Sequence, residues 1–351
     1  MRLLHLTFLF SILSLFSSDP ARKYSRSSPE TNEIPLSDDS VLANDAEAIA
    51  TNILLQSKDG GQTWQDMSQW LPEKEIPLDF FAGETDVYVR GEYTMYRSKS
   101  NLTIPVWEKE NVPAPGRASL VFNRSGLMAH HYEGHVYKKI SATGTWQPVY
   151  TNFKKHSIRT VFETSDGMIF LGCDEGLFKS TDQGQSWKHV HNEGWVMSLV
   201  EGEGVFIATG DKGIMRSTDG GEHWEWVISE GGVGIAVERI AGGFAAISYN
   251  GTTRSRRIRI SMDGGKNWKA IDERIQTAMF VLPMNGMEAS GLISSIKQMG
   301  THLVCGHPRG IYLSPDMGRT WKMVHSGVDK KVYKIYAAGP VLYAVLMAEG
   351  C

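Results

Sequence analysis

An eight-residue motif, Ser-x-Asp-x-Gly-x-x-Trp, recurs along the chain and constrains its fold more than any other feature. Five intact copies span Ser57–Trp64, Ser180–Trp187, Ser217–Trp224, Ser261–Trp268 and Ser314–Trp321. Two degenerate copies precede Trp107 and Trp146. The seven tryptophans follow one another at spacings of 43, 39, 41, 37, 44 and 53 residues. A period of about 40 residues with short strands in each repeat is typical of the four-stranded blades of a β-propeller.

The strand pattern between the motifs favours the same fold. Before the copy at Ser180 come short apolar or alternating runs at 158–162, 168–172 and 176–180, each bounded by turn-forming residues. The segments 332–335 and 341–347 resemble the first two strands of a blade, and 52–56 with its motif resembles the last two. The two ends would then share one blade, which closes the ring without an open sheet edge. We therefore expect an all-β fold, a seven-bladed β-propeller of four-stranded antiparallel blades over residues 51–351.

The motif residues are predicted to have structural roles. An aspartate in a turn accepts hydrogen bonds from nearby backbone N–H groups, and a glycine adopts positive φ there. The tryptophan then opens the outer strand and supplies a large apolar surface for packing. The residues assigned to this structural set are Asp59, Trp64, Asp182, Trp187, Asp219, Trp224, Asp263, Trp268, Asp316 and Trp321.

The motif and its spacing resemble those of the BNR/Asp-box β-propellers over residues 52–350. Such boxes occur in sialidases, in endo-xyloglucanase-type glycoside hydrolases, in sortilin-type receptors and in photosystem II assembly-factor propellers. The resemblance therefore implies a fold and leaves the activity open. Sialidases carry an Arg-Ile-Pro-like motif ahead of their boxes. Neither Arg-Ile-Pro nor Arg-Leu-Pro occurs in this chain, which argues against sialidase activity.

The N-terminal segment resembles a secretory signal peptide, with a basic start and an apolar run from Leu3 to Phe16. We predict a signal peptide over 1–18, a flexible polar lead-in over 19–50 and a secreted or periplasmic protein; an uncleaved N-terminal anchor is the alternative, with no other membrane span. A net charge of −3 does not favour nucleic acid as a partner. Three cysteines without metal-ligand spacing predict neither a disulfide framework nor a metal or other cofactor.

Candidate site residues are expected on the face opposite the boxes, where turns between second and third strands meet the links between blades. Asp174 and Asp211 occupy comparable turns of adjacent repeats. Two carboxylates across a cleft can act as acid and base in glycoside hydrolysis, which makes them the candidate catalytic pair. The alternative interpretation is that both cap tight hairpin turns, where aspartate is favoured by its turn chemistry.

The same face is predicted to carry the candidate ligand-binding residues His131, Trp195, Arg254, Arg256, His307 and Arg309. Arginine binds carboxylates through paired hydrogen bonds, and an aromatic residue at a blade link can stack on a sugar ring. Adjacent histidines on a strand, as at 130–131, point to opposite faces, so we predict no metal site. The apolar link 272–291 is a candidate lid or docking element. Solvated arginines and histidines, and a link packed onto its own blades, are the alternatives.

These observations lead to one functional hypothesis and two alternatives. We expect an exported, monomeric, non-catalytic recognition propeller that binds a glycan or a protein on the face opposite the boxes. The first alternative is a carbohydrate-active enzyme, a glycoside hydrolase or polysaccharide lyase that uses Asp174 and Asp211. The second alternative is an assembly or scaffold factor for a membrane complex, which the family resemblance implies.

Overall fold

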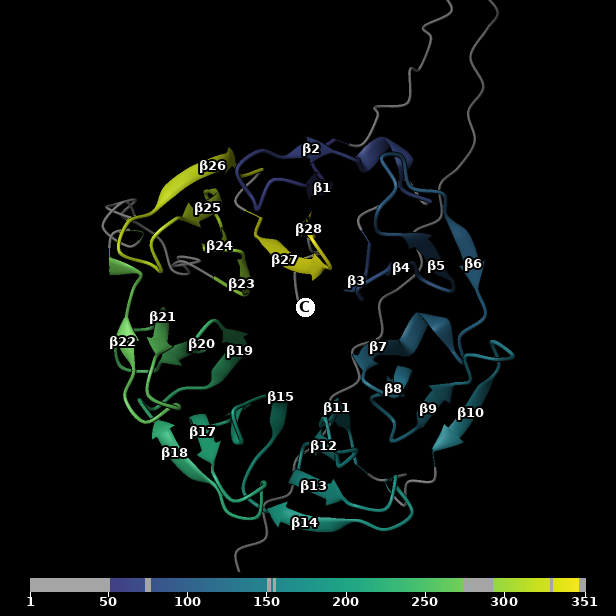
Figure 1. The fold of residues 1–351 in the computed structure, drawn as a ribbon, viewed down its shortest axis with the longest axis vertical. Coiled ribbons are helices and arrows are strands. Elements are labelled where there is room, and N and C mark those ends of the chain that lie inside the picture. The colour runs from purple at the N-terminus through teal and green to yellow at the C-terminus, as the bar shows by residue number, and fades with distance from the viewer. Residues whose placement is uncertain are drawn as a thin grey trace, which may run out of the picture. The chain divides into compact units, whose positions relative to one another are not determined.

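A computed structural model describes residues 51–72, 77–149, 153, 156–273, 275, 293–328 and 331–346. These residues form a ring of seven four-stranded antiparallel sheets around a central channel (Figure 1), so the expected all-β seven-bladed propeller is confirmed. In each blade the first strand faces the channel and the fourth lies at the rim. The predicted signal peptide 1–18, the lead-in 19–50 and most of the 272–291 link lie outside the described residues.

Blades I to III contain the following strands. Blade I consists of β3 (Asp79–Ala82), β4 (Asp86–Arg90), β5 (Met95–Lys99) and β6 (Glu108–Glu110). Blade II consists of β7 (Ala118–Asn123), β8 (Gly126–His131), β9 (Val136–Lys139) and β10 (Trp146–Val149). Blade III consists of β11 (Ile158–Glu163), β12 (Ile169–Cys173), β13 (Gly176–Ser180) and β14 (Lys188–His191). Short 3-10 turns, η1 (Ser68–Trp70) and η2 (Pro115–Arg117), flank blade I.

Blades IV to VII complete the ring. Blade IV consists of β15 (Val196–Gly202), β16 (Val205–Gly210), β17 (Gly213–Ser217) and β18 (Glu225–Ile228). Blade V consists of β19 (Gly234–Ile240), β20 (Gly243–Asn250), β21 (Ser255–Ser261) and β22 (Lys269–Ala270). Blade VI consists of β23 (Ile296–Met299), β24 (His302–His307), β25 (Gly310–Ser314) and β26 (Lys322–Ser326). Blade VII consists of β27 (Tyr333–Ala338), β28 (Val341–Leu346), β1 (Leu54–Ser57) and β2 (Gln65–Asp66).

Blade VII joins the two ends of the described chain, as the sequence predicts. Strand β28 pairs antiparallel with β1, with Leu54 opposite Val345 and Ser57 opposite Leu342. The edge that β1 would otherwise expose is therefore paired within the ring.

Each intact box forms the turn between the third and fourth strands of a blade. In the first box the Ser57 hydroxyl donates to Asp59 Oδ1 at 2.9 Å and accepts the N–H of Gly61 at 2.9 Å. The Asp59 carboxylate also accepts the N–H of Thr63 at 3.0 Å, and Trp64 Nε1 donates to the Gly61 carbonyl at 3.1 Å. Serine and aspartate play the same parts in the other four boxes. The box thus satisfies its own backbone groups, which makes it a rigid turn.

Neighbouring blades are held together by packed apolar side chains and by hydrogen bonds to the boxes. Between blades IV and V, for example, the buried side chains of Ile207, Ile214 and Phe244 pack together. On the third strands, Lys179 Nζ donates to the carbonyl of Gly220 at 2.8 Å, in the box of the next blade. This position therefore links one blade to the following box.

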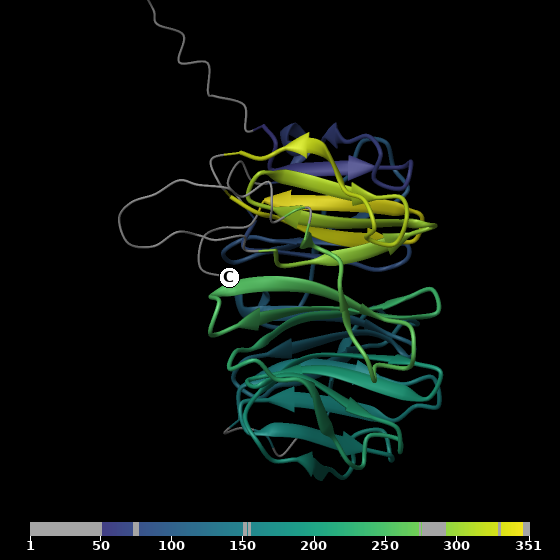
Figure 2. The ribbon, with the colours of Figure 1, turned by 90° about the vertical axis from the view of Figure 1, so that its left-hand side faces the viewer.

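The loops collect on two opposite faces of the ring. Seen from the side, the strands run from one face to the other (Figure 2). Because neighbouring strands are antiparallel, the boxes share one face with the turns between first and second strands. The turns between second and third strands and the links between blades lie on the opposite face, which we call the linker face. In the described part of the chain, no helix is both long and apolar enough for a membrane span.

Candidate functional site

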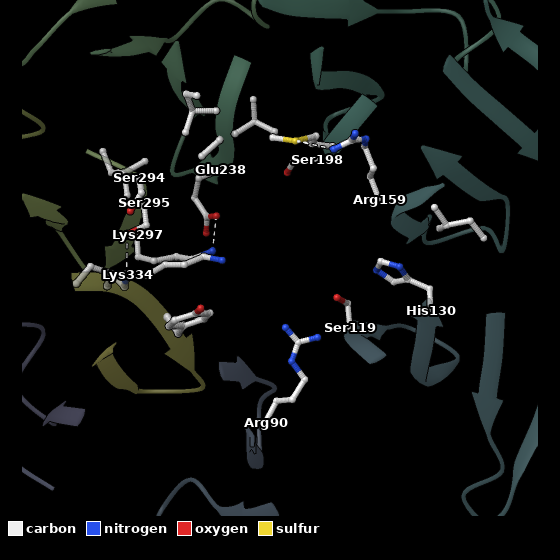
Figure 3. A pocket seen from close by; sticks show the side chains of 18 of the residues that line it. Arg90, Ser119, His130, Arg159, Ser198, Glu238, Ser294, Ser295, Lys297 and Lys334 are labelled. Carbon is white, nitrogen blue, oxygen red and sulfur yellow. Dashed lines mark hydrogen bonds and ion pairs between the residues drawn. The ribbon is translucent and has the colours of Figure 1, made fainter. Parts of the chain in front are cut away.

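A cavity of about 590 Å³ occupies the central channel. Its walls come from the inner strands of six blades, namely β7, β11, β15, β19, β23 and β27. Side chains from the linker-face ends of β4 and β8 complete the wall (Figure 3). Its volume lies within the range of small-ligand sites, which is about 300–1,000 Å³.

The cavity wall carries more positive than negative charge, although the whole chain has a net charge of −3. Its basic side chains are those of Arg90, Arg117, Arg159, Lys297 and Lys334. Glu238 is the one carboxylate among the described residues that line it. A channel with low-dielectric walls and basic groups concentrates anions from solution.

Four of the five basic side chains have an acidic partner, in the pairs Arg90–Asp79, Arg117–Glu133, Arg159–Asp174 and Lys297–Glu238. The Lys297 ammonium is 2.5 Å from the Glu238 carboxylate, whereas the Arg90 guanidinium is 3.5 Å from that of Asp79. Lys334 has no ion-pair partner within the described ranges, and its Nζ lies 5.3 Å from the ring centroid of Tyr336. Among the described residues, the cavity therefore holds one basic group without an ion-pair partner and a second, Arg90, whose ion pair is longer than that of Lys297.

Arg159 organises the polar groups at one side of the channel mouth. Its guanidinium lies 5.5 Å from the ring centroid of Tyr132 and 5.4 Å from that of Trp195. Its Nε donates to Asp174 Oδ1 at 2.5 Å, and the Tyr132 hydroxyl donates to Oδ2 at 3.3 Å. Burial raises the pKa of Asp174, but hydrogen bonds from Ser157 and Arg159 outweigh it and lower the pKa overall. The structure thus brings Asp174 and Trp195 together around an arginine that the sequence analysis did not select.

Asp211 has a different environment. One carboxylate oxygen of Asp211 is buried without a hydrogen-bond partner. The carboxylate packs directly on Gly194, where an added Cβ would lie 2.1 Å from Asp211 Cγ. The neighbouring Lys212 pairs with Glu193 at 2.7 Å. Within the described residues, no hydrogen bond or ion pair joins Asp211 to Asp174, and the catalytic assignment of the two stays a prediction.

His130 is a buried imidazole on the cavity wall. Its side chain has 5% exposure, and its Nδ1 has no hydrogen-bond partner. Burial, with a further contribution from the charge of His131, lowers the pKa of His130 to about 4, although its ring bonds to the Ile158 backbone. The imidazole is therefore neutral at neutral pH.

The two histidines that the sequence analysis selected, His131 and His307, make local contacts away from the cavity wall. His131 is buried, and its Nε2 lies 2.8 Å from the carbonyl oxygen of Pro113. His307 is also buried, and its Nδ1 accepts the N–H of Arg309 at 3.1 Å. Neither histidine lines the channel cavity.

The three arginine candidates are also absent from the cavity wall. Arg254 is exposed in a turn with a φ of 52°, and Arg309 is exposed next to β25. Arg256 is partly buried, and its Nη1 donates to the carbonyl of Ile293 at 3.1 Å. The described residues contain no group of three or more potential metal ligands.

Sequence reasoning missed the charged residues of the inner strands. Arg159, Glu238, Lys297 and Lys334 each directly follow a buried apolar residue of a first strand. A charged side chain inside such an apolar run is the signal that could have identified them, because first strands line the channel of a propeller. Arg90 ends a second strand and gives no comparable signal.

No protein-family model and no curated protein matches the sequence. Among solved structures, the GH74 xyloglucanase from Xanthomonas campestris superposes with a TM-score of 0.58 and 14% identity over 78% of this chain. The chain spans 52% of that enzyme's length. A structure described as YCF48 bound to D1 peptide gives a TM-score of 0.54 and 15% identity, over 79% of this chain and 95% of that one. Virginiamycin B lyase from Staphylococcus aureus superposes with a TM-score of 0.56 and 11% identity, over 78% of this chain and 95% of that one. These similarities establish the propeller fold.

Proposed function

We propose that the protein is an exported recognition propeller of the Asp-box type, which binds a glycan or protein partner in the channel on its linker face. The observation that carries this proposal is the cavity wall, where five basic side chains face one carboxylate and Lys334 lacks a counterion within the described residues. Tyr132, at 55% exposure, adds an aromatic surface to the same wall. Basic and aromatic groups on a rigid scaffold are suited to ligand recognition.

The side chains favour binding over glycoside hydrolysis. A glycosidase acid requires a carboxyl group whose pKa is raised, so that it carries a proton at working pH. The pKa of Asp174 is lowered instead, and Arg159 holds its carboxylate. Glu238 is paired with Lys297. A solved propeller with a bound peptide and a propeller-containing xyloglucanase both lie among the structural neighbours, so the proposal keeps protein and glycan partners.

The test combines a glycan array, a partner capture and a polysaccharide-turnover screen on the exported chain. We expect a ligand whose binding is lost in Lys334→Gln and retained in the double variant Asp174→Asn/Asp211→Asn, with no release of reducing ends. Arg319→Gln, on the exposed side of a box, is the matched control. Product release that disappears in the double variant would replace this proposal with a carbohydrate-active enzyme.

A further inference from the structure

Two buried polar atoms without a hydrogen-bond partner belong to residues that line the channel cavity. They are Nε of Arg90 and Nδ1 of His130. Both side chains point into the cavity from the adjacent blades I and II, and Ser119 lies between them (Figure 3). Buried polar atoms in folded proteins are nearly always hydrogen-bonded, so two such side chains on one cavity wall indicate a place for a ligand's polar groups.

The two atoms require different hydrogen-bond partners. The Nε–H of Arg90 is a permanent, charged donor and requires an acceptor such as a carboxylate oxygen. The His130 ring is neutral, so its Nδ1 is an acceptor in one tautomer and a donor in the other. A hydroxyl both donates and accepts, so it satisfies Nδ1 in either tautomer. A ligand that satisfies both carries an acidic group and a hydroxyl close together.

The remainder of the cavity favours the same ligand. Lys334, which has no counterion among the described residues, supplies positive charge on the wall opposite His130 (Figure 3). Arg90 Nη1 donates to the Ala118 carbonyl at 3.2 Å and Nη2 lies 3.5 Å from the Asp79 carboxylate, so Nε is the guanidinium nitrogen without a partner among the described residues. The exposed ring of Tyr132 offers an apolar surface to the carbon face of a sugar.

We propose that the channel cavity binds an acidic saccharide, with the carboxylate of a uronic acid on Arg90 and Lys334 and a ring hydroxyl hydrogen-bonded to Nδ1 of His130. This inference rests on the proposed function and narrows its ligand to a chemical class. A simple carboxylate would satisfy Arg90 but brings no hydroxyl to His130. An acidic peptide is a different class of partner and is one outcome of the test.

The experiment is titration calorimetry of the exported chain with oligomers of galacturonic, glucuronic and mannuronic acid. The methyl esters of the same oligomers keep every hydroxyl but lose the charge, adipate keeps carboxylates without hydroxyls, and tri-glutamate represents acidic peptides. We expect at least one acidic oligomer to bind, its ester to bind at least about tenfold more weakly, and affinity to fall at high salt.

Three channel variants and one control locate the site. Arg90→Lys, which keeps the charge but loses the planar fork, and Lys334→Gln should each weaken binding of the acidic oligomer by about tenfold or more. His130→Phe should weaken binding of the oligomer but leave binding of adipate unchanged, since adipate has no hydroxyl to place on Nδ1. Arg319→Gln, on the box face, should bind as the wild type does. Melting curves identify any variant that fails to fold, and Lys334→Gln tests a partly exposed side chain that has no ion pair to the described part of the chain.

Each remaining outcome overturns the inference. Equal binding of acid and ester, tighter binding of tri-glutamate, or equal losses in Lys334→Gln and Arg319→Gln would each contradict an acidic-saccharide site in the channel. Absence of binding by the oligomers of all three uronic acids would also contradict the inference. The proposed recognition function would still hold after any of these results if the array or the partner capture finds a ligand whose binding is lost in Lys334→Gln.

Discussion

At the scale of single residues, the second glycine of a box has to meet two requirements at once. Gly221 has a φ of 80°, which a residue with a side chain adopts only at a cost. An added Cβ would also lie 2.5 Å from Cζ of Phe170, a buried ring of the preceding blade. Gly220 has a similar φ of 73°, but its nearest neighbour to such a Cβ is Lys179 Nζ at 3.8 Å. Alanine at Gly220 would therefore test the backbone conformation alone, whereas alanine at Gly221 would test the backbone conformation and the packing together.

We predict that Gly221→Ala destabilises the fold more than Gly220→Ala does. Both variants place alanine at positive φ, which costs about 1–2 kcal/mol. Gly221→Ala also forces its methyl group against Phe170, and overpacking of this kind costs about 1–3 kcal/mol more. Urea denaturation of the two variants measures the difference directly. Equal losses of unfolding free energy would show that the box glycine is needed for its backbone conformation alone.

A second prediction at this scale concerns acid. The hydroxyl and the backbone N–H of Ser186 hydrogen-bond to Asp182 and lower its pKa from 3.8 to about 2. A folded-state pKa below the unfolded value contributes stability that is complete above pH 3.8 and is lost as the pH falls toward 2. Asp182→Asn keeps an acceptor but cannot titrate.

Urea midpoints measured across this acid range should therefore fall less in Asp182→Asn than in the wild type. Glu203→Gln, which removes an acidic group from an exposed turn, is the control for net charge. Parallel loss of stability in Asp182→Asn and the wild type would contradict a titrating role for the box aspartate.

At the scale of elements, the third strand of one blade is connected to the box of the next. Lys179 on β13 is nearly buried, and its ammonium donates to the Gly220 carbonyl and to Glu222 at 2.6 Å. Lys188 on β14 pairs with the other oxygen of Glu222, also at 2.6 Å, but its side chain is 70% exposed. Two lysines thus share one carboxylate in different environments.

We predict that Lys179→Met lowers the unfolding free energy by about 1–3 kcal/mol, because it leaves the Gly220 carbonyl and Glu222 without a buried donor. Lys188→Met should change it by less than about 1 kcal/mol, as is usual for exposed ion pairs. Thermal melting of both variants is the measurement. A larger loss in Lys188→Met would show that the exposed ion pair, and not the buried lysine, stabilises this junction between the two blades.

The predictability of the fold and of the site also differs at this scale. The boxes recur with fixed residue types, so the blade register, the 3–4 turns and the shared blade VII were predicted from residues such as Ser57, Asp59 and Trp64. The channel wall has no such repeat, because equivalent positions of the inner strands carry unrelated side chains. The contact of Asp174 with Arg159, fifteen residues earlier, depends on how β11 and β12 pair, which no local pattern encodes.

At the scale of the whole molecule, the ring depends on pairing between the two ends of the chain. We predict that a chain ending at residue 328 loses cooperative unfolding, because β27 and β28 are missing and the edge of β1 is exposed. A synthetic peptide of residues 331–346 should restore it in trans. Leu342 and Ala344 are fully buried, so a peptide with Leu342→Asp and Ala344→Asp is the control.

Thermal melting followed by tryptophan fluorescence shows whether the shortened chain, with or without the peptide, unfolds cooperatively. Cooperative melting of the shortened chain at the wild-type temperature would contradict the prediction. Rescue by the aspartate-containing peptide would show that strand pairing alone, without the buried side chains, closes the ring.

The two faces of the ring separate the residues that determine the fold from those that determine what the channel binds. The boxes stand at one end of the blades and the channel wall toward the other. Six blades contribute their inner strands to that wall, and blade I contributes the end of β4. Figure 1 shows the inner strands arranged around the channel. A mutation that alters one channel position thus changes only part of one blade's share of the binding surface and leaves the repeat that folds the blade untouched. Specificity in such a molecule can diverge one blade at a time, while the sequence signature of the architecture persists.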